Sequence, residues 1–223
     1  MLMSFNNIWF AYESSKHVLK GISFDIKHGE KIALLGLNGS GKSTLILHTN
    51  GLLLPQKGEV LVNGVSTKSK GLYGIRQKVG IVFQNPEDQL FMPTVKEDVA
   101  FGPRNMELSE KEIEERVNYA LTVTKTLELA NRSQFELSGG QKKSVSIATV
   151  LSMTPELLVM DEPTSGLDYL AVRNFIELVK SLPQALLIST HDIDLAKRVT
   201  SRAIVLKEGE IISDTQINQL EYP

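Results

Sequence analysis

The segment KIALLGLNGSGKST, residues 31–44, decides the fold of this chain. Its first part, Lys31–Leu35, is a short apolar run that predicts a buried strand, and residues 45–47 predict the start of a helix. Between them, residues 36–44 match the phosphate-loop pattern G-x-x-x-x-G-K-[ST], which needs this order of strand, loop and helix. The glycines let successive backbone N–H groups face phosphate oxygens, and the helix N-terminus adds a partial positive charge.

The polar side chains at the end of this loop each have an expected role. Lys42 would meet the β- and γ-phosphates of a nucleotide, Ser43 would ligate Mg²⁺, and Thr44 would make a further phosphate contact. The loop residues expected to bind the nucleotide are Gly36, Asn38, Gly39, Ser40, Gly41, Lys42, Ser43 and Thr44.

A second apolar strand, predicted at residues 157–160, ends in two carboxylates. Asp161 at its C-terminal end would hold Mg²⁺ through water. Glu162 alternates to the other side of the strand, where it can face an attacking water as general base. Pro163 disfavours helix at Glu162 and therefore ends the strand.

A second anion-binding element is the sequence LSGGQ at residues 137–141, which precedes a helix predicted over residues 142–153. Ser138 can cap that helix, and Gly139 and Gly140 leave its first N–H groups bare. One chain thus carries two separate devices for binding a triphosphate.

The fold class predicted for the chain is α/β, with a P-loop core built on a mainly parallel sheet, because short runs rich in Val, Ile and Leu alternate with helical patterns. The predicted core strands are residues 31–35, 79–83, 157–160, 185–189 and 203–206. Residues 4–12, 19–26 and 59–62 predict an N-terminal antiparallel β subdomain. Glu208 and Gly209 predict a hairpin turn between the last two strands.

Between the two halves of this core the pattern becomes helical. Ser109 and Glu112 form a capping box, and apolar residues then recur at helical spacing. We expect one domain over residues 1–223, in which residues 1–85 and 154–223 form the core with its β subdomain. Residues 86–153 would form an inserted helical subdomain.

Composition limits the possible classes of protein. The 223 residues are 42% hydrophobic and 22% charged, which supports a sizeable core. The net charge of -2 argues against a strong basic field for nucleic acid or anionic lipid, and the lack of cysteine excludes disulfides and thiolate chemistry. No signal peptide or membrane-spanning stretch is evident, so any membrane role is expected to be peripheral.

With these motifs in place, the sequence resembles an ATP-binding-cassette (ABC) ATPase over nearly its whole length. Residues 137–141 match the signature of that family, and the other family elements occur in order. By this resemblance Gln84 is the Q-loop glutamine, Asp168 belongs to the D-loop at residues 165–168, and His191 is the switch histidine. Tyr12 would stack on adenine.

The resemblance implies that two such domains pack head to tail around ATP. Ser138, Gly139, Gly140 and Gln141 would contact the ATP held by the partner subunit, and Asp168 would communicate across the dimer. The catalytic residues would be Glu162, which activates water, His191, which holds the γ-phosphate, and Gln84, which senses Mg²⁺ and the water. Mg²⁺ would contact Ser43, Gln84 and Asp161.

Two kinds of ABC ATPase are compatible with these motifs: a transport motor, or a soluble ATPase acting on nucleic acid or ribosomes. The short interval from Gln84 to Leu137 has no heptad run, and the chain has one cassette and no surplus of basic residues, which favours transport. Residues 84–91 and 99–103 resemble the ATPase subunits of energy-coupling-factor importers of cobalt, nickel or vitamins. The nature of the substrate stays open.

That resemblance also implies partners and a location. The expected partners are a second ATPase subunit (an identical copy or a paralogue), an integral-membrane coupling subunit and a substrate-binding membrane subunit, with no nucleic acid. The chain would then lie at the cytoplasmic face of the cell membrane.

Two departures from the family pattern stand out. Ser144 occupies a position where relatives usually carry arginine. Many energy-coupling-factor ATPases also continue into a dimerisation extension that this sequence, ending at Pro223, lacks. We therefore expect nucleotide and the membrane partner to hold two copies together.

Overall fold

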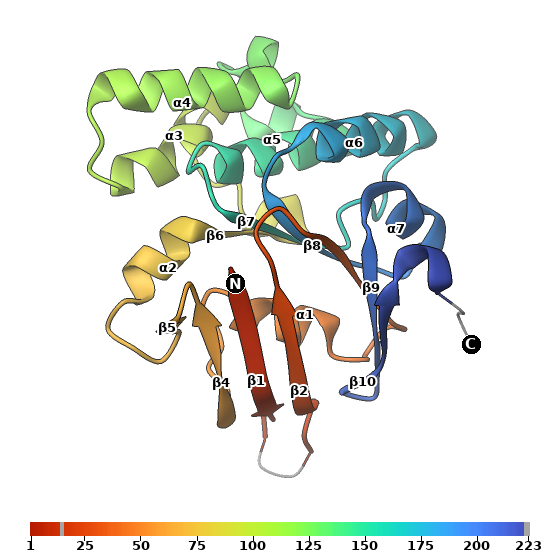
Figure 1. Ribbon diagram of the computed structural model, residues 1–223. Helices are drawn as coiled ribbons and strands as arrows, with labels where there is room; N and C mark the ends of the chain where they lie inside the picture. Colours follow the sequence, from red (N-terminus) through yellow and green to blue (C-terminus); the bar gives the residue numbers. More distant parts are fainter. Residues whose placement is uncertain (14–15, 221–223) are drawn as a thin grey trace. The chain divides into compact units, whose positions relative to one another are not determined.

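The computed structural model describes residues 1–13 and 16–220, arranged as helices and strands in two compact units (Figure 1). The first unit comprises Met1–Ile81, Glu156–Glu162 and Pro183–Pro223. The second comprises Val82–Pro155 and Pro163–Leu182. Pro223 lies outside the described residues.

The central sheet has six strands in the order β10-β9-β3-β8-β7-β6. Strand β3 pairs in parallel with both β8 and β9, β7 pairs in parallel with β8, and the terminal hairpin β9–β10 is antiparallel. The bounds are β3 Lys31–Leu35, β6 Val79–Val82, β7 Leu157–Asp161, β8 Ala185–Thr190, β9 Arg202–Lys207 and β10 Glu210–Gln216. The prediction of a mainly parallel sheet is confirmed, and so is the turn at Glu208 and Gly209.

The inner strands of the central sheet are buried because their residues are almost all apolar. Every residue of β7 and β8 is buried, which is expected for parallel strands covered on both faces. In β10 burial alternates along the strand, as expected at a half-exposed edge.

The N-terminal antiparallel sheet is also as predicted, in the order β2-β1-β4-β5. Its strands are β1 Met3–Phe10, β2 Leu19–Ile26, β4 Lys57–Val62 and β5 Val65–Ser66, and β1, β2 and β4 run side by side in red to orange (Figure 1). The first strand was predicted two residues too long at its end: it stops at Phe10, so Tyr12 lies beyond it.

The helices of the first unit are short. They are α1 Lys42–His48, α2 Leu72–Lys78, α7 Ile193–Val199 and the 3₁₀ turn η4 Ile217–Gln219. Helix α1 follows the phosphate loop directly, so the predicted order of strand, loop and helix is confirmed.

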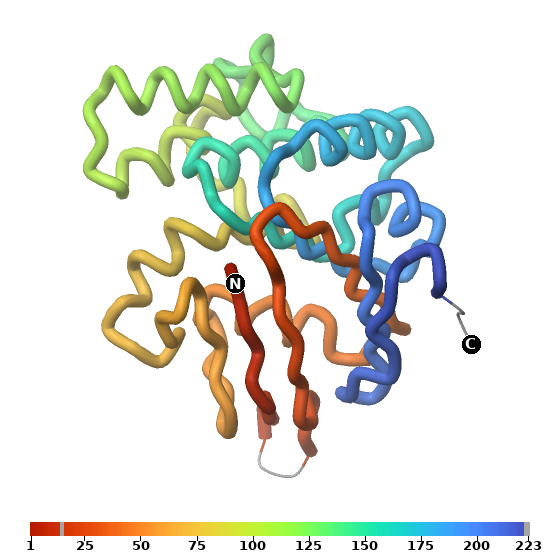
Figure 2. Tube along the Cα trace, viewed as in Figure 1, coloured from red at the N-terminus to blue at the C-terminus, as the bar shows by residue number. Residues whose placement is uncertain are grey.

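The second unit is mainly helical. Its elements are η1 Pro86–Asp88, α3 Val95–Asn105, α4 Glu110–Val123, η2 Leu127–Leu129, η3 Gln134–Glu136, α5 Gly139–Leu151 and α6 Tyr169–Ser181. Helices α3, α4 and α5 pack against one another, and their green to teal segments can be followed in Figure 2. The predicted capping box of α4 is present, with Ser109 Oγ accepting from Glu112 N.

Helix α5 begins earlier than the sequence suggested. Its first residue is Gly139 and its last is Leu151, instead of the predicted 142–153. The reason is a second capping box, because the Ser138 hydroxyl accepts from Gln141 N while the Gln141 side chain accepts from Ser138 N. This cap outweighs the low helix propensity of the two glycines.

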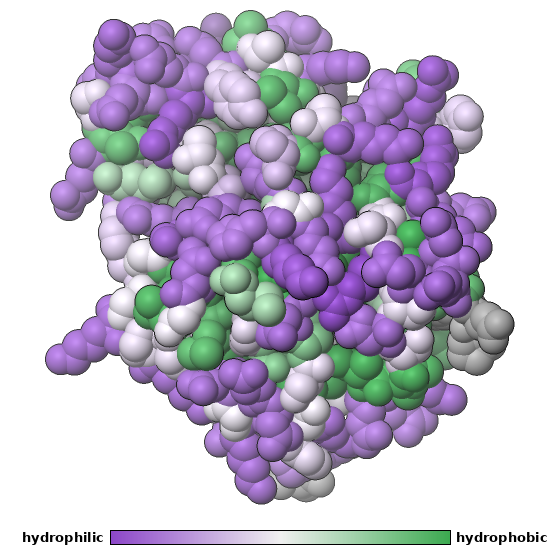
Figure 3. Space-filling model, in the orientation of Figure 1, coloured by the Kyte–Doolittle hydropathy of each residue, from purple (hydrophilic) through white to green (hydrophobic). Residues whose placement is uncertain are grey.

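Hydrophilic residues cover most of the face seen in Figure 3, with hydrophobic residues in scattered patches. In the part of the chain that the structure describes, we find no helix with the length and apolar character needed to cross a bilayer.

Candidate nucleotide-binding and catalytic site

The phosphate loop has a backbone that only glycine can adopt at two of its corners. Gly36 has φ 155°, and a Cβ there would stand 2.3 Å from the carbonyl oxygen of Leu206. Gly41, at the N-cap of α1, has φ 108°. The loop is therefore fixed by the space left between β3, α1 and β9, in the shape that brings backbone N–H groups together.

Lys42 is buried at the first position of α1, and its ammonium group is held by the loop itself. Its Nζ donates to the carbonyl oxygens of Gly36 at 2.8 Å and Leu37 at 3.3 Å. The same Nζ lies 3.6 Å from Glu162 Oε1. Burying a charge is costly unless it is paired and hydrogen-bonded, and these oxygens therefore hold the ammonium group in the loop.

Glu162 lies directly after β7 and contacts two of the other predicted site residues. His191 Nδ1 is 3.2 Å and 3.1 Å from its two carboxylate oxygens, and Lys42 Nζ is the second contact. Glu162 is 8% exposed and has a φ of 41°. A positive φ is uncommon for a residue other than glycine, so the surrounding structure must hold this carboxylate in place.

Ser189, on β8, supplies that support and was not predicted from the sequence. Its buried hydroxyl accepts from Glu162 N at 3.1 Å and donates to Asp161 Oδ1. The Glu162 N–H also donates to the Ser189 carbonyl oxygen. Ser189 thus holds the Asp161 carboxylate and the backbone of Glu162, and the only sequence signal was its place two residues before His191.

Tyr12 and Thr44 are joined through their hydroxyls at 3.2 Å. The Tyr12 ring is 62% exposed and meets the ring of Phe10 edge to face, with centroids 5.0 Å apart. An exposed aromatic face tied to the phosphate-loop helix is suitable for stacking on a base.

These residues fit ATP and Mg²⁺ in their chemistry. The Ser40 hydroxyl is buried in the loop and has no hydrogen-bond partner among the described residues, as expected for a group reserved for a phosphate oxygen. Ser43 is exposed, and Asp161 presents a carboxylate at the end of β7. Hydroxyl and carboxylate oxygens are the ligands Mg²⁺ prefers, with phosphate oxygens and water completing its shell.

The remaining predicted residues belong to the second unit. Gln84 is exposed at the end of β6, and its backbone carbonyl accepts from the Lys143 ammonium on α5. Gly139 and Gly140 form the first turn of α5, and Gln141 is engaged in the cap with Ser138. Asp168 is the N-cap of α6, where its Oδ1 accepts from Ala171 N at 2.8 Å.

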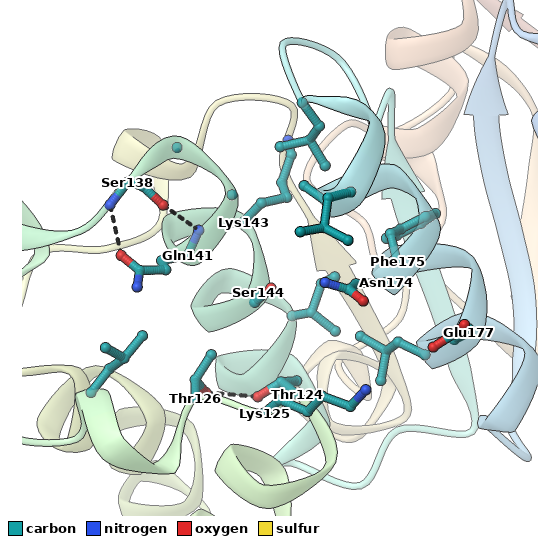
Figure 4. Close-up of a pocket in the computed structure, with 18 of the residues that line it drawn as sticks. Thr124, Lys125, Thr126, Ser138, Gln141, Lys143, Ser144, Asn174, Phe175 and Glu177 are labelled. Atoms are coloured by element: carbon teal, nitrogen blue, oxygen red, sulfur yellow. Dashed lines mark hydrogen bonds between the residues drawn. The ribbon is translucent and has the colours of Figure 1, made fainter.

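A cavity of about 660 Å³ lies beside the signature, between α5, α6 and residues 123–129. Figure 4 shows Ser138 and Gln141 at one end of it, with Ser144, Asn174 and Glu177 along its walls. Ser144 lines this cavity, so its position faces open space that a longer side chain could enter.

Residues 84–91 and 99–103, the two segments that resemble energy-coupling-factor ATPases, each present an aromatic ring. Phe91 and Phe101 are 58% and 45% exposed and meet edge to face, with centroids 4.9 Å apart. The buried Asp98 holds the backbone at Phe91, because its Oδ1 accepts from the backbone N–H groups of Phe91 and Met92 at 3.0 Å. Burial raises the pKa of the Asp98 carboxyl.

Comparison with known proteins gives consistent matches along the chain. A model of the ABC transporter family matches residues 19–165. A putative ABC transporter ATP-binding protein of Methanothermobacter marburgensis is 50% identical over 213 residues, covering 93% of this chain and 77% of the relative. An energy-coupling factor transporter ATP-binding protein of Methanocaldococcus jannaschii is 47% identical, covering 93% of this chain and 76% of the relative.

Solved structures agree with these sequences. CbiO1 of Clostridium perfringens, described as part of the ABC transporter complex CbiONQ, matches with a TM-score of 0.89 and 41% identity, covering 98% of this chain and 89% of CbiO1. An ATP-binding cassette solved as a dimer in a post-hydrolysis state with ADP and Pi matches with a TM-score of 0.86 and 29% identity, covering 98% of this chain and all of that one.

Proposed function

We propose that this chain, which belongs to the ABC transporter family, is the ATP-hydrolysing motor of an energy-coupling-factor importer and closes as a dimer around ATP. The ATPase activity is that of the family. We propose in addition that the chain serves an importer of the energy-coupling-factor type, that it works as a dimer, and that its site residues have the roles given below.

The observation that carries the catalytic part is the contact of Glu162 with both His191 and Lys42. Lys42 would bind the β- and γ-phosphates, and Glu162 would take a proton from the attacking water. His191 would hold the γ-phosphate and orient the Glu162 carboxylate. Mg²⁺, held by Ser43, Asp161 and Gln84, would neutralise charge on the phosphate oxygens.

The signature supports pairing. Gly139 and Gly140 carry no side chain over the first turn of α5. A Cβ added at Gly139 would meet no described atom within 4 Å outside its own turn, and one at Gly140 would lie 3.4 Å from Ala171 Cβ. A phosphate held by a second copy can therefore approach the N–H groups of this turn closely. Ser138, Gly139, Gly140 and Gln141 would complete the partner's site, and Asp168 would relay closure between the subunits.

The exposed rings of Phe91 and Phe101 suit an apolar helix of a membrane partner. We infer that an integral-membrane coupling subunit docks there, and that a separate membrane subunit selects a transition-metal ion (cobalt or nickel) or a vitamin. The chain would then work at the cytoplasmic face of the cell membrane. The second ATPase subunit would be an identical copy or a paralogue.

The substitution Glu162→Gln tests the proposal, because it removes the base while keeping the shape of the side chain. We expect hydrolysis to fall at least about 100-fold, with ATP trapped in a dimer that light scattering detects. Glu115→Gln, on the exposed face of α4, should behave as the parent chain. Normal turnover by Glu162→Gln would remove Glu162 from its assigned role.

A further inference from the structure

Helix α5 is attached to the Q-loop, residues 84–89, at both ends of that loop. At its start, the Lys143 ammonium donates to the carbonyl oxygen of Gln84. At its end, the Gln89 amide donates to the Ser146 carbonyl oxygen and to Thr149 Oγ1, both at 2.7 Å. All of these residues belong to the second unit, so the loop and the signature helix are joined within one compact body.

Gln89 also reaches back to the strand that leads into the loop. Its side-chain oxygen accepts from Phe83 N at 3.2 Å while its nitrogen is bound to α5. The two ends of the loop are therefore held near the same helix, with the exposed part of the loop between them. Gln84 is exposed, so its side chain is available to a ligand while its backbone is fixed.

Lys143 is unusual because a lysine ammonium is rarely buried. The residue is 3% exposed, and burying its charge costs free energy unless hydrogen bonds compensate. A hydrogen bond from a cation to a carbonyl is stronger than a neutral one. The contact with Gln84 therefore restrains the backbone at the very residue whose side chain the proposed mechanism uses.

We propose that Lys143 is a positioning residue for ATP hydrolysis: it sets the backbone of Gln84 and makes the Q-loop move together with the signature helix. The proposal rests on the function proposed above, since it assigns Gln84 a contact with Mg²⁺ and the attacking water. Lys143 itself contacts neither ATP nor Mg²⁺ in this account.

Its neighbour Lys142 provides a matched control. Lys142 also pairs with the Q-loop, through Glu87 Oε1 at 2.8 Å, and this hydrogen bond lowers the pKa of Glu87. The Glu87 side chain is 65% exposed, however, and exposed ion pairs contribute little. The two adjacent lysines thus differ mainly in burial and in which atom of the loop they hold.

The experiment is a double-mutant cycle in the full chain, with turnover measured against ATP and against Mg²⁺. The variants are Lys143→Met, Gln84→Ala, the double variant and Lys142→Met. We expect Lys143→Met to lower kcat about 10-fold and to raise the Mg²⁺ concentration for half-maximal rate, while KM for ATP changes less than about 2-fold. A loss of folded protein alone would not move the Mg²⁺ requirement.

The cycle separates the possible outcomes. If Lys143 acts through Gln84, the double variant should be no slower than Gln84→Ala, and Lys142→Met should stay within about 2-fold of the parent. The proposal would be overturned if the fold-loss of kcat in the double variant equalled the product of the two single losses, or if Lys143→Met had a normal kcat. Normal kcat and Mg²⁺ dependence in Gln84→Ala would instead contradict the function proposed for Gln84.

A second variant covers poor folding of Lys143→Met. Lys143→Gln keeps a neutral donor on a shorter side chain, and its kcat and Mg²⁺ requirement should lie between those of the parent and of Gln84→Ala. A Lys143→Gln protein that melts at a lower temperature but needs the same Mg²⁺ concentration as the parent would show a purely structural role and would overturn the proposal.

Discussion

At the scale of single residues, the site is held by contacts between strands rather than by neighbours in the sequence. Asp161 and Ser189 are opposite each other in the parallel pair β7–β8, so the serine hydroxyl can reach both the Asp161 carboxylate and the backbone N–H of Glu162. Glu162 follows with a positive φ and faces His191. The hydrogen bond to Ser189 therefore helps to hold Glu162 in a backbone conformation that is otherwise unfavourable.

His48 provides a prediction at this scale. Its ring is fully buried at the last residue of α1, with Nδ1 2.7 Å from the Thr44 carbonyl oxygen, and Nε2 has no hydrogen-bond partner among the described residues. Burial lowers the pKa of His48 below its ordinary 6.5. The unfolded chain therefore binds this proton more readily than the folded chain does.

The contribution of His48 to the free energy of unfolding should therefore be fully present above about pH 6.5. It should fall as the pH decreases toward the lowered pKa, by at most about 1.4 kcal/mol per pH unit. Urea unfolding at about pH 7.5 and pH 5.5 measures this slope. His48→Gln should reduce it, while the exposed His28→Gln should not. An unchanged slope in His48→Gln would contradict the assignment.

At the scale of elements, the sequence predicted those parts that depend on local pattern. Strands β2 and β3 have the predicted bounds because turns limit them on both sides. Helix α2 was missed, since only Ile75 of its seven residues is buried and no apolar period is visible. The roles of Ser189 and Lys143 were missed because they depend on strand register and on a contact 59 positions away.

The capping box of Ser109 and Glu112 is expected to stabilise the start of α4. Glu112 Oε2 accepts from Ser109 N at 3.0 Å and from Ser109 Oγ at 2.7 Å, and these bonds lower the pKa of Glu112. Ser109→Ala should destabilise the helical unit by about 1 kcal/mol. Ser109→Thr, which keeps the hydroxyl, should lose less.

Hydrogen exchange of the α4 amides, followed residue by residue, measures the effect on this helix. Faster exchange confined to Ser109→Ala is expected. Equal protection in both variants would mean that the packing of α4 on α3 and α5, rather than its cap, determines where the helix begins.

At the scale of the whole molecule, the residues proposed to handle ATP are divided between two compact units. The first carries the phosphate loop, Asp161, Glu162 and His191, and the second carries Gln84, the signature and Asp168. We propose that residues 1–223 work as one ATPase domain, with residues 86–153 as its helical subdomain, and that two chains share each ATP. The motifs could be predicted from the sequence because each is a local pattern. The pairing of two chains could not be predicted in this way, because it depends on contacts with a second chain.

The most direct test of pairing is the hydrolysis rate per protomer measured over a wide range of protein concentration, with light scattering on the same samples. Because each ATP is proposed to need Lys42 of one chain and Ser138 of the other, the rate per protomer should rise with concentration and level off as dimers form. Ser138→Arg should stay near zero throughout. A rate per protomer that is constant down to concentrations where only monomer is present would contradict the account.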